Sequence, residues 1–297
     1  MRGTLNAQRQ VGGIFSLIDS RETTGNVFYV NSSTGSDVAG NGQNPDAPFA
    51  TINYAVTQCT DNNGDLIIVM PGHTETIIAA GGITVDKIGV KIVGIGRGRN
   101  RPVINYTTSA AGTFLVSAAN AWIENVVFKP LGVASVVTAV SVTAADATFN
   151  LCEFELANGT NQAVAGITTT AAADRLTVQN CKFHGSNNAG TNAALVIVGG
   201  DSHFIFNNVF QGAYGQTVGA ISQITTTTTN CIIQFNYIQN FTAGATKAIT
   251  MTASSTGQIS DNNMQILSGT APITGAAMSW VGCNYYAATI ATAGTLI

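Results

Sequence analysis

The stretch "LTVQNCKF" (176–183) decides the fold, because five other stretches repeat its pattern. They are "AWIENVVF" (121–128), "ATFNLCEF" (147–154), "HFIFNNVF" (203–210), "CIIQFNYI" (231–238) and "GQISDNNM" (257–264). The apolar residues five places before the last letter are Ile123, Phe149, Val178, Ile205, Ile233 and Ile259, with steps of 26, 29, 27, 28 and 26. Ile67 and Ile92 continue this series upstream. A period of this length, built of short segments rich in Val, Ile, Thr and Phe, predicts the coils of a β-solenoid with parallel stacked strands.

A second series of strand-like segments runs half a period away from the first. Its members are "TFLVS" (113–117), "AVSV" (139–142), "VAGI" (164–167), "ALVI" (194–197), "AIS" (220–222), "AITM" (248–251) and "AMSW" (277–280). Two strand series that share one period indicate that each coil contributes a strand to each series.

Alternation within each phrase predicts which side chains point into the solenoid. The last letters point inward: Phe128, Phe154, Phe183, Phe210, Ile238 and Met264. The residues two places earlier also point inward: Val126, Cys152, Cys181, Asn208, Asn236 and Asn262. The apolar and inward positions are three apart, which breaks the period of two, so we expect a bend between them. At such a bend, stacked Asn amides can bond to one another, and Cys can fill the same slot without a hydrogen-bond partner.

Composition narrows the class of protein. Only 9% of the 297 residues are charged and the net charge is −3, so neither nucleic acid nor a membrane is an expected partner. The five cysteines are odd in number and lack metal-ligand spacing, which favours reduced thiols and no metal or cofactor. A Cys152–Cys181 disulfide is geometrically conceivable. The first residues contain no signal-peptide core, which favours a protein made in a cytosol.

The segment from residue 27 to 78 predicts how the solenoid begins. A strand, "VFYVN" (27–31), leads through a polar loop to "PFATINYAVTQC" (48–59), where Ile52, Ala55, Val56 and Cys59 have helical spacing. We expect this helix, at about 49–59, to cover the unpaired edges at the end of the stack.

The order "YVNSSTGSD…NPDAPFATINYAV…GDLIIVMPGHTETI" resembles the entry of the pectate-lyase-like right-handed parallel β-helix superfamily. The resemblance implies an all-β, right-handed parallel β-helix solenoid of roughly eight to ten coils. It would carry an N-terminal arm (1–26), a β-helix domain (27–297) and the capping helix. That superfamily includes polysaccharide lyases, glycosidases, phage tailspikes and non-enzymatic virion proteins, so the likeness predicts a fold and leaves the function open.

Few residues are candidates for chemistry. Asp174 and Asp201 both lie nine residues before their Phe and could stack beside His203, as a retaining glycosidase would require. The flanking "AAADR" and "GGDSH" favour turns supported by Asp instead. Glu153 and Lys182 are expected to form a surface ion pair between coils. The basic loop "GRGRNR" (96–101) could hold an anion or extend into solvent.

The sequence therefore favours a non-enzymatic structural protein of a phage particle, one that decorates or cements the head and resides in the virion after assembly in the host cytoplasm. The expected partner is the major capsid protein or another virion protein. Flat faces rich in Thr, Ala and Gly would suit a closed homotrimer, which is the usual arrangement of the phage β-helices that the chain resembles. The arm would bind that partner through Arg2, Arg9, Val11, Ile14, Phe15, Leu17 and Arg21. The alternatives are a tailspike or depolymerase fragment that binds or cleaves polysaccharide, and a cell-surface or secreted adhesin or binding module.

Overall fold

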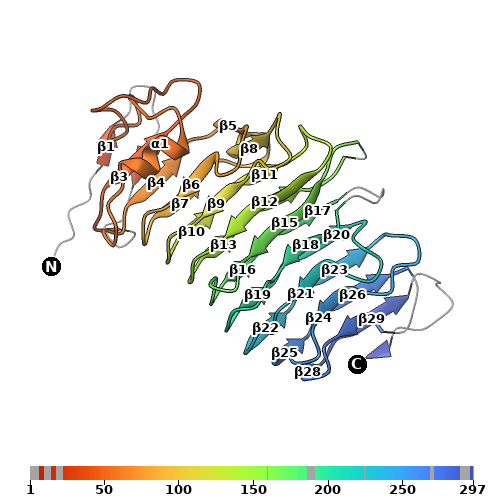
Figure 1. The fold of residues 1–297 in the computed structure, drawn as a ribbon. Coiled ribbons are helices and arrows are strands. Elements are labelled where there is room, and N and C mark those ends of the chain that lie inside the picture. The colour runs from red at the N-terminus through yellow and green to blue at the C-terminus, as the bar shows by residue number, and fades with distance from the viewer. Residues whose placement is uncertain are drawn as a thin grey trace.

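The chain forms an all-β parallel solenoid with little helix, seen in a computed structural model (Figure 1). The structure describes residues 23–158, 160–185, 191–223, 225–267 and 271–283 in full. Of residues 7–9, 15–17, 284–287 and 295–296 it describes the backbone. Within these residues the chain runs through three sheets in turn, and strands of successive coils lie side by side along the molecule (Figure 1).

Each of the three sheets contains one strand from each successive coil. The first sheet is built from β3 (Val27–Val30), β4 (Leu66–Val69), β7 (Lys91–Gly94), β10 (Trp122–Glu124), β13 (Thr148–Asn150), β16 (Thr177–Gln179), β19 (Phe204–Phe206), β22 (Cys231–Gln234), β25 (Gly257–Ser260) and β28 (Met278–Val281). The second is built from β5 (Thr74–Ile77), β8 (Val103–Tyr106), β11 (Val127–Lys129), β14 (Glu153–Glu155), β17 (Lys182–His184), β20 (Val209–Gly212), β23 (Tyr237–Asn240), β26 (Asn263–Ile266) and β29 (Asn284–Ala287), with β30 (Thr295–Leu296) antiparallel to β29. The third is built from β6 (Ile83–Val85), β9 (Phe114–Val116), β12 (Val136–Val142), β15 (Ala163–Thr169), β18 (Ala193–Val196), β21 (Ile221–Gln223), β24 (Ile249–Met251) and β27 (Ile273–Thr274).

The strand register confirms the interior column predicted from the repeat. Paired positions run without a slip through Ile67, Ile92, Ile123, Phe149, Val178, Ile205, Ile233 and Ile259. All eight side chains are buried. The eight strands of the third sheet enclose seven intervals, so the described residues make about seven full turns, fewer than the eight to ten expected.

The last letters of the repeated phrases form a second interior column. Phe128, Phe154, Phe183 and Phe210 stack with ring centroids 4.8, 4.5 and 4.7 Å apart and interplanar angles of 14°, 5° and 13°. Ile238 and Met264 continue the column. Because aromatic contacts add about 0.5–1.5 kcal/mol each beyond area burial, this stack is a principal source of core stability.

The expectation of two strands per coil was wrong, because the bend inside each phrase divides it into two strands in different sheets. "TFNLCEF", for example, holds β13 and β14. The segment "AMSW" was also misplaced: its last three residues belong to β28, which pairs with β25 in the first sheet. The last coil is shorter, and β27 takes the expected place in the third sheet.

The inner side of the bend carries the predicted Asn ladder. Asn236 Oδ1 accepts hydrogen bonds from the backbone N–H and Nδ2 of Asn208, at 2.9 and 3.0 Å. Asn236 Nδ2 donates to Ile205 O and Asn262 Oδ1, both at 2.9 Å. Cys152 and Cys181 occupy the same column in earlier coils, and their thiols point to main-chain carbonyls. All five cysteines are buried, and no two of them are joined in a disulfide in the structure.

The outer side of the same bend is formed by one residue per coil in the left-handed backbone conformation, and we call this row the bend column. Its members and φ angles are Asn125 (56°), Leu151 (55°), Asn180 (55°), Asn207 (53°), Phe235 (56°), Asp261 (54°) and Gly282 (67°). In every member of the bend column except Gly282, the backbone N–H donates a hydrogen bond to a main-chain carbonyl oxygen of the next coil. The backbone therefore makes the same left-handed bend in seven successive coils.

A short helix, α1 (Ile52–Thr57), confirms the helical spacing near residue 52. Thr51 caps it by accepting the N–H of Tyr54 at 3.1 Å, and Ile52, Ala55 and Val56 are buried. The helix contacts β3, β4 and β6, the strands at the start of the stack (Figure 1). No helix of the described chain has the length and apolar character to span a membrane.

Part of the arm lies outside the described residues. Within it, β1 (Ala7–Arg9) pairs antiparallel with β2 (Phe15–Leu17), so that Arg9 lies opposite Phe15 and Ala7 opposite Leu17. Arg2, Val11, Ile14 and Arg21 of the predicted partner-binding set fall outside the described residues. The arm's binding role stays a prediction.

Candidate functional site

The sequence's candidate acid–base residues meet at a turn between the third and first sheets, where their polar atoms hold the turn. Asp174 Oδ1 accepts the backbone N–H of Asp201 at 2.9 Å. The Asp201 carboxylate accepts hydrogen bonds from the Thr229 hydroxyl, from Ser202 Oγ at 2.9 Å and from Asn230 Nδ2 at 3.0 Å. These hydrogen bonds, that of Thr229 foremost, lower the pKa of Asp201 and keep it ionised, which suits a turn more than a proton donor.

His203 is buried beneath this turn and its two ring nitrogens are both occupied. Nε2 lies 2.8 Å from Gly199 O, which can only accept, so Nε2 carries the proton. Nδ1 accepts the Leu176 N–H at 3.3 Å. Burial lowers the pKa of His203, which favours the neutral ring that these two contacts require. Asp174 and Asp201 thus accept hydrogen bonds within the turn, and His203 bonds to main-chain atoms beneath it.

Arg175 follows Asp174 in the chain, and its backbone N–H donates to Asp201 O at 2.7 Å, but its side chain binds a different carboxylate. Its guanidinium donates to both carboxylate oxygens of Asp146, from Nε at 2.6 Å and from Nη2 at 2.8 Å. That bidentate hydrogen bonding lowers the pKa of Asp146 and raises that of Arg175. The pair clamps one coil to the next.

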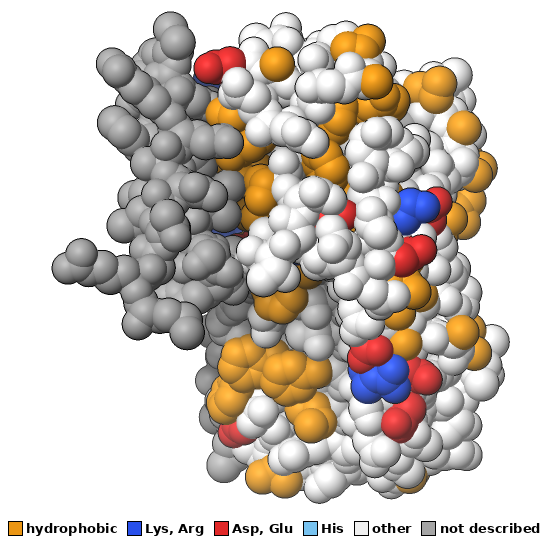
Figure 2. Space-filling view, turned by 90° about the vertical axis from the view of Figure 1, so that its left-hand side faces the viewer, with side chains coloured by type: hydrophobic (Ala, Val, Ile, Leu, Met, Phe, Trp, Pro, Cys, Tyr) orange, Lys and Arg blue, Asp and Glu red, His pale blue; other side chains and the backbone are white. Residues whose placement is uncertain are grey.

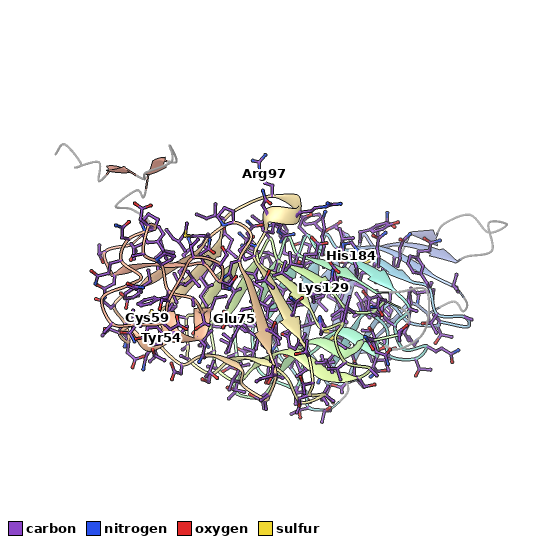
Figure 3. All side chains as sticks on the ribbon, turned by 90° about the horizontal axis from the view of Figure 1, so that it is seen from above. Tyr54, Cys59, Glu75, Arg97, Lys129 and His184 are labelled. Carbon is purple, nitrogen blue, oxygen red and sulfur yellow. The ribbon has the colours of Figure 1, made fainter. Side chains whose placement is uncertain are left out.

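A charged cluster that the sequence reasoning largely missed lies on the outer face of the second sheet. Arg101 Nη1 contacts Glu153 Oε2 at 2.6 Å, and His184 Nε2 lies 3.5 Å from Glu153 Oε1. Lys129 Nζ contacts Glu155 Oε2 at 2.7 Å on the neighbouring row. Figure 3 labels Arg97, Lys129 and His184 in this part of the molecule. In a chain with 9% charged residues, this concentration stands out.

The predicted Glu153–Lys182 ion pair does not form, although the two residues are register neighbours. Glu153 is engaged by Arg101, which reaches it from the loop before β8 across two coils. Lys182 therefore has no ion-pair partner among the described residues. No spacing in the sequence relates the loop to Glu153, so this competition could not be predicted.

An open pocket of about 260 Å³ lies between the basic loop and the bend column. Its lining includes Arg97 from the loop around η1 (Gly98–Asn100), together with Lys182 and Leu151. Arg101 also lines it, and its Nη2 donates to Leu151 O at 2.7 Å. Arg97 and Lys182 are exposed and form no ion pair within the described chain, so the mouth of the pocket is cationic. The basic loop, for which the sequence left anion binding and exposure to solvent both open, thus has a cavity beside it.

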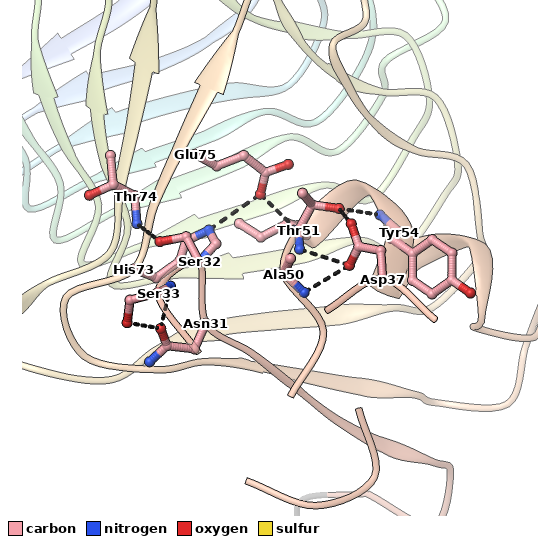
Figure 4. Close-up of polar contacts among 11 residues, drawn as sticks. Asn31, Ser32, Ser33, Asp37, Ala50, Thr51, Tyr54, His73, Thr74 and Glu75 are labelled. Carbon is pink, nitrogen blue, oxygen red and sulfur yellow. Dashed lines mark hydrogen bonds and ion pairs between the residues drawn. The ribbon is translucent and has the colours of Figure 1, made fainter. Parts of the chain in front are cut away.

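A second polar network lies at the start of the stack (Figure 4). The buried Glu75 accepts the Ile52 N–H at 2.7 Å with Oε2, and His73 Nε2 lies 3.3 Å from the same oxygen. Asp37 accepts the N–H groups of Ala50 and Thr51, at 2.7 and 3.1 Å, and the Thr51 hydroxyl at 2.7 Å. These contacts fix the start of α1, and the network is structural.

Charge is sparse on the face seen from the N-terminal side of Figure 1. Where Figure 2 draws described residues, white predominates, basic side chains lie beside acidic ones, and apolar side chains gather in several places. Within the described residues, no group of three or more His, Cys, Asp and Glu side chains is placed to hold a metal ion.

No protein-family model matches the sequence. No curated protein matches it either. Among solved structures, the chain is similar to a rhamnogalacturonan lyase, with 12% identity and a TM-score of 0.38 over 91% of this chain and 79% of that one. It is also similar to the GH136 lacto-N-biosidase from Eubacterium ramulus, with 11% identity and a TM-score of 0.41 over 88% of this chain and 68% of that one. The three sheets, each with one strand from each coil, define the class of protein as a parallel β-solenoid. The likeness to these solved structures extends to the fold alone.

Proposed function

We propose that the chain is a non-enzymatic structural protein of a phage particle that decorates or cements the head. The proposal rests on the hydrogen bonding of Asp174 and Asp201, the two residues that the sequence indicated as candidates for acid–base catalysis. Their carboxylates accept main-chain and side-chain hydrogen bonds that hold a turn. The other repeated polar contacts, such as the Asn236 ladder, likewise serve the stack.

The proposal includes the finer features that the sequence predicted. The winding is right-handed, α1 closes the first end of the stack, and three chains associate through flat faces of the solenoid. The partner is the major capsid protein or another virion protein, bound through the arm (1–26). Nucleic acid and membranes are not partners, and the location is the virion.

The first test locates the protein. Electron cryomicroscopy of the particle that contains the chain should reveal solenoid density on the head lattice. Density at a tail tip would contradict the head role and favour the polysaccharide-binding alternative. Deletion of residues 1–26 should abolish attachment to the head and leave the melting temperature of the solenoid nearly unchanged. Attachment of the truncated chain would refute the role of the arm.

The second test addresses chemistry. The double variant Asp174→Asn/Asp201→Asn keeps an acceptor oxygen at each position, so it should retain any attachment to the particle. Release of reducing ends from host polysaccharide by the parent chain, and its loss in this variant, would overturn the non-enzymatic assignment.

One observation favours polysaccharide binding as a second function, that of a tailspike or depolymerase. Phe204 and Phe206 stack at 5.3 Å on the outer face of the first sheet, and Phe235 meets Phe206 edge-on at 5.5 Å. Exposed aromatic rings can stack on sugars. Isothermal titration with host surface glycans tests this function, and heat of binding that disappears in Phe206→Ala would support it.

A further inference from the structure

Two members of the bend column do not suit its backbone conformation. The positions before and after them hold Asn, Asp or Gly, which tolerate the left-handed region. Leu151 and Phe235 hold φ angles of 55° and 56° there, although the conformation disfavours bulky side chains by about 1–2 kcal/mol. The fold does not require this backbone strain, because the neighbouring coils make the same bend with Asn. The strain therefore indicates a function for the Leu151 and Phe235 side chains.

Both side chains are also half exposed. Leu151 leaves 49% and Phe235 leaves 48% of its surface in solvent. Neither therefore gains the full burial that would offset the backbone strain. A large apolar side chain held outward by a strained backbone has the character of an anchor for a partner.

The residues around Leu151 favour a negatively charged group on the ligand. Leu151 lines the 260 Å³ pocket together with Arg97 and Lys182, two lining cations that form no ion pair among the described residues. Arg101 in the same pocket is neutralised by Glu153, so the uncommitted charge there is that of Arg97 and Lys182. A carboxylate of the occupant would complement them.

The surroundings of Phe235 select an apolar group. Phe235 contacts Phe206, which stacks on Phe204, and together the three rings form an apolar patch one coil before Asp261 of the bend column. Between Leu151 and Phe235 lie Asn180 and Asn207. Asn207 Nδ2 donates to Asn180 Oδ1 at 2.8 Å, and Asn180 Nδ2 donates to Asn150 Oδ1 at 2.9 Å.

We propose that this edge, from the Arg97–Lys182 pocket past Leu151 to Phe235, binds an extended acidic segment of a partner protein. Leu151 and Phe235 are three coils apart, which is about 14 Å at the strand spacing. An extended peptide covers that distance in about four residues, so a carboxylate and an apolar side chain of the partner would be about four residues apart.

The chemistry of the edge favours a peptide over a glycan. The amides between its ends are bonded to one another, which limits the directed donors for sugar hydroxyls. An aliphatic anchor such as Leu151 offers no ring face for a sugar to stack on. The inference rests on the proposed function in requiring a protein partner, and it adds a second contact surface and the chemistry of its ligand.

The test measures binding of a defined peptide array to the full chain. Each fluorescein-labelled octapeptide carries Asp or Glu at two to six residues from Leu or Phe, in both orders, and a matched peptide carries Asn or Gln instead. Fluorescence anisotropy at 50 mM and 300 mM NaCl should show binding of at least one acidic peptide, about tenfold weaker for its neutral match and weaker at high salt. Failure of every acidic peptide to bind more tightly than its match would overturn the proposal.

The variants separate the parts of the edge. Arg97→Ala/Lys182→Ala, Leu151→Asn and Phe235→Asn should each weaken binding at least tenfold. The matched controls are Lys247→Ala, which removes a half-buried cation elsewhere whose Nζ donates to Ala271 O, and Ile78→Asn, which removes an exposed apolar side chain elsewhere. Both variants should bind as the parent does. Circular dichroism confirms folding of each variant. Unchanged binding by Leu151→Asn would overturn the proposal.

Two further experiments distinguish this proposal from the proposed function. Deletion of residues 1–26 should leave peptide binding unchanged, whatever it does to attachment to the phage head. An oligogalacturonate offered in the same assay should bind no more tightly than the neutral peptides. Binding of that acidic sugar with loss in Arg97→Ala/Lys182→Ala, and no binding of acidic peptides, would assign the edge to a glycan and refute the peptide assignment.

Discussion

The coils that contain Cys152 and Cys181 and the coils that contain Asn208, Asn236 and Asn262 turn the same bend with different chemistry. In the earlier coils the inner column is filled by small, soft thiols whose partners are main-chain carbonyls. In the later coils it is a continuous amide ladder. The backbone at the bend is the same in both regions, with φ angles between 53° and 56°.

The outer face of the second sheet shows the same division. The earlier coils carry ion pairs, such as Arg101–Glu153, and the later coils carry a Gln ladder in which Gln211 donates to Gln239 and Gln239 to Gln265, at 2.7 and 2.6 Å. The fold therefore needs a compatible side chain at each position and does not prescribe which one. At some positions a coil has a different type of side chain from its neighbours, and the fold gains no stability from it. We expect functional residues at such positions.

The largest expected effect sharpens the comparison of the two inner columns. Asn236→Ala removes the hydrogen bonds that this side chain accepts and donates inside the ladder, and leaves buried polar groups of Asn208 and Asn262 unpaired. We expect a loss of about 3–4 kcal/mol of unfolding free energy. Cys181→Ala should lose only about 1 kcal/mol, because a small apolar group replaces a thiol that makes weak hydrogen bonds. Urea unfolding measures both, and equal losses would break the distinction between the columns.

The second prediction applies to the outer faces. Arg101→Ala removes an ion pair that is largely shielded from solvent, with the Arg101 side chain 13% exposed, and a hydrogen bond to Leu151 O. We expect a loss of about 1–2 kcal/mol that shrinks as salt is raised. Gln239→Ala removes neutral amide hydrogen bonds at a half-buried site and should lose about 0.5–1 kcal/mol, independent of salt. Unfolding at 50 mM and 500 mM NaCl distinguishes the two, and a salt-independent Arg101 effect would contradict the ionic account.

The third prediction concerns His203, in the coil where the inner column changes from Cys to Asn. Since burial lowers the pKa of the folded His203 ring, the unfolded chain binds its proton more tightly. The stability linked to His203 is therefore fully present above the ordinary His pKa of about 6.5 and is lost as the pH falls below it. Unfolding free energies at pH 7.5 and 5.5 should differ in the parent and differ less in His203→Gln. An equal fall in both proteins would assign the pH effect to other groups.

The sequence predicted the interior of the molecule well because burial forces periodicity. The column through Ile123 and the stack through Phe154 follow from spacing alone, since a buried strand position accepts few residue types. The Asn ladder was predictable for the same reason: a buried amide column needs a partner in each coil.

The surface was less predictable because outward positions are weakly constrained. Arg101 reaches Glu153 from a loop whose course no spacing reveals. The bend column did leave a signal, since Asn125, Asn180 and Asn207 all stand one residue before the inner position. Leu151 and Phe235 break that signal, and their significance needs the left-handed φ angles, which only a structure provides.

The most direct measurement of the central claim, that departures from the repeat serve function and not the fold, is the unfolding free energy of Leu151→Asn. Relief of the left-handed strain, about 1 kcal/mol, should offset the small loss of apolar burial when a half-exposed side chain is replaced. We predict a stability equal to or above that of the parent chain. A fall of more than about 1 kcal/mol, which is the size of the strain itself, would mean that Leu151 is retained for the fold and would contradict the claim.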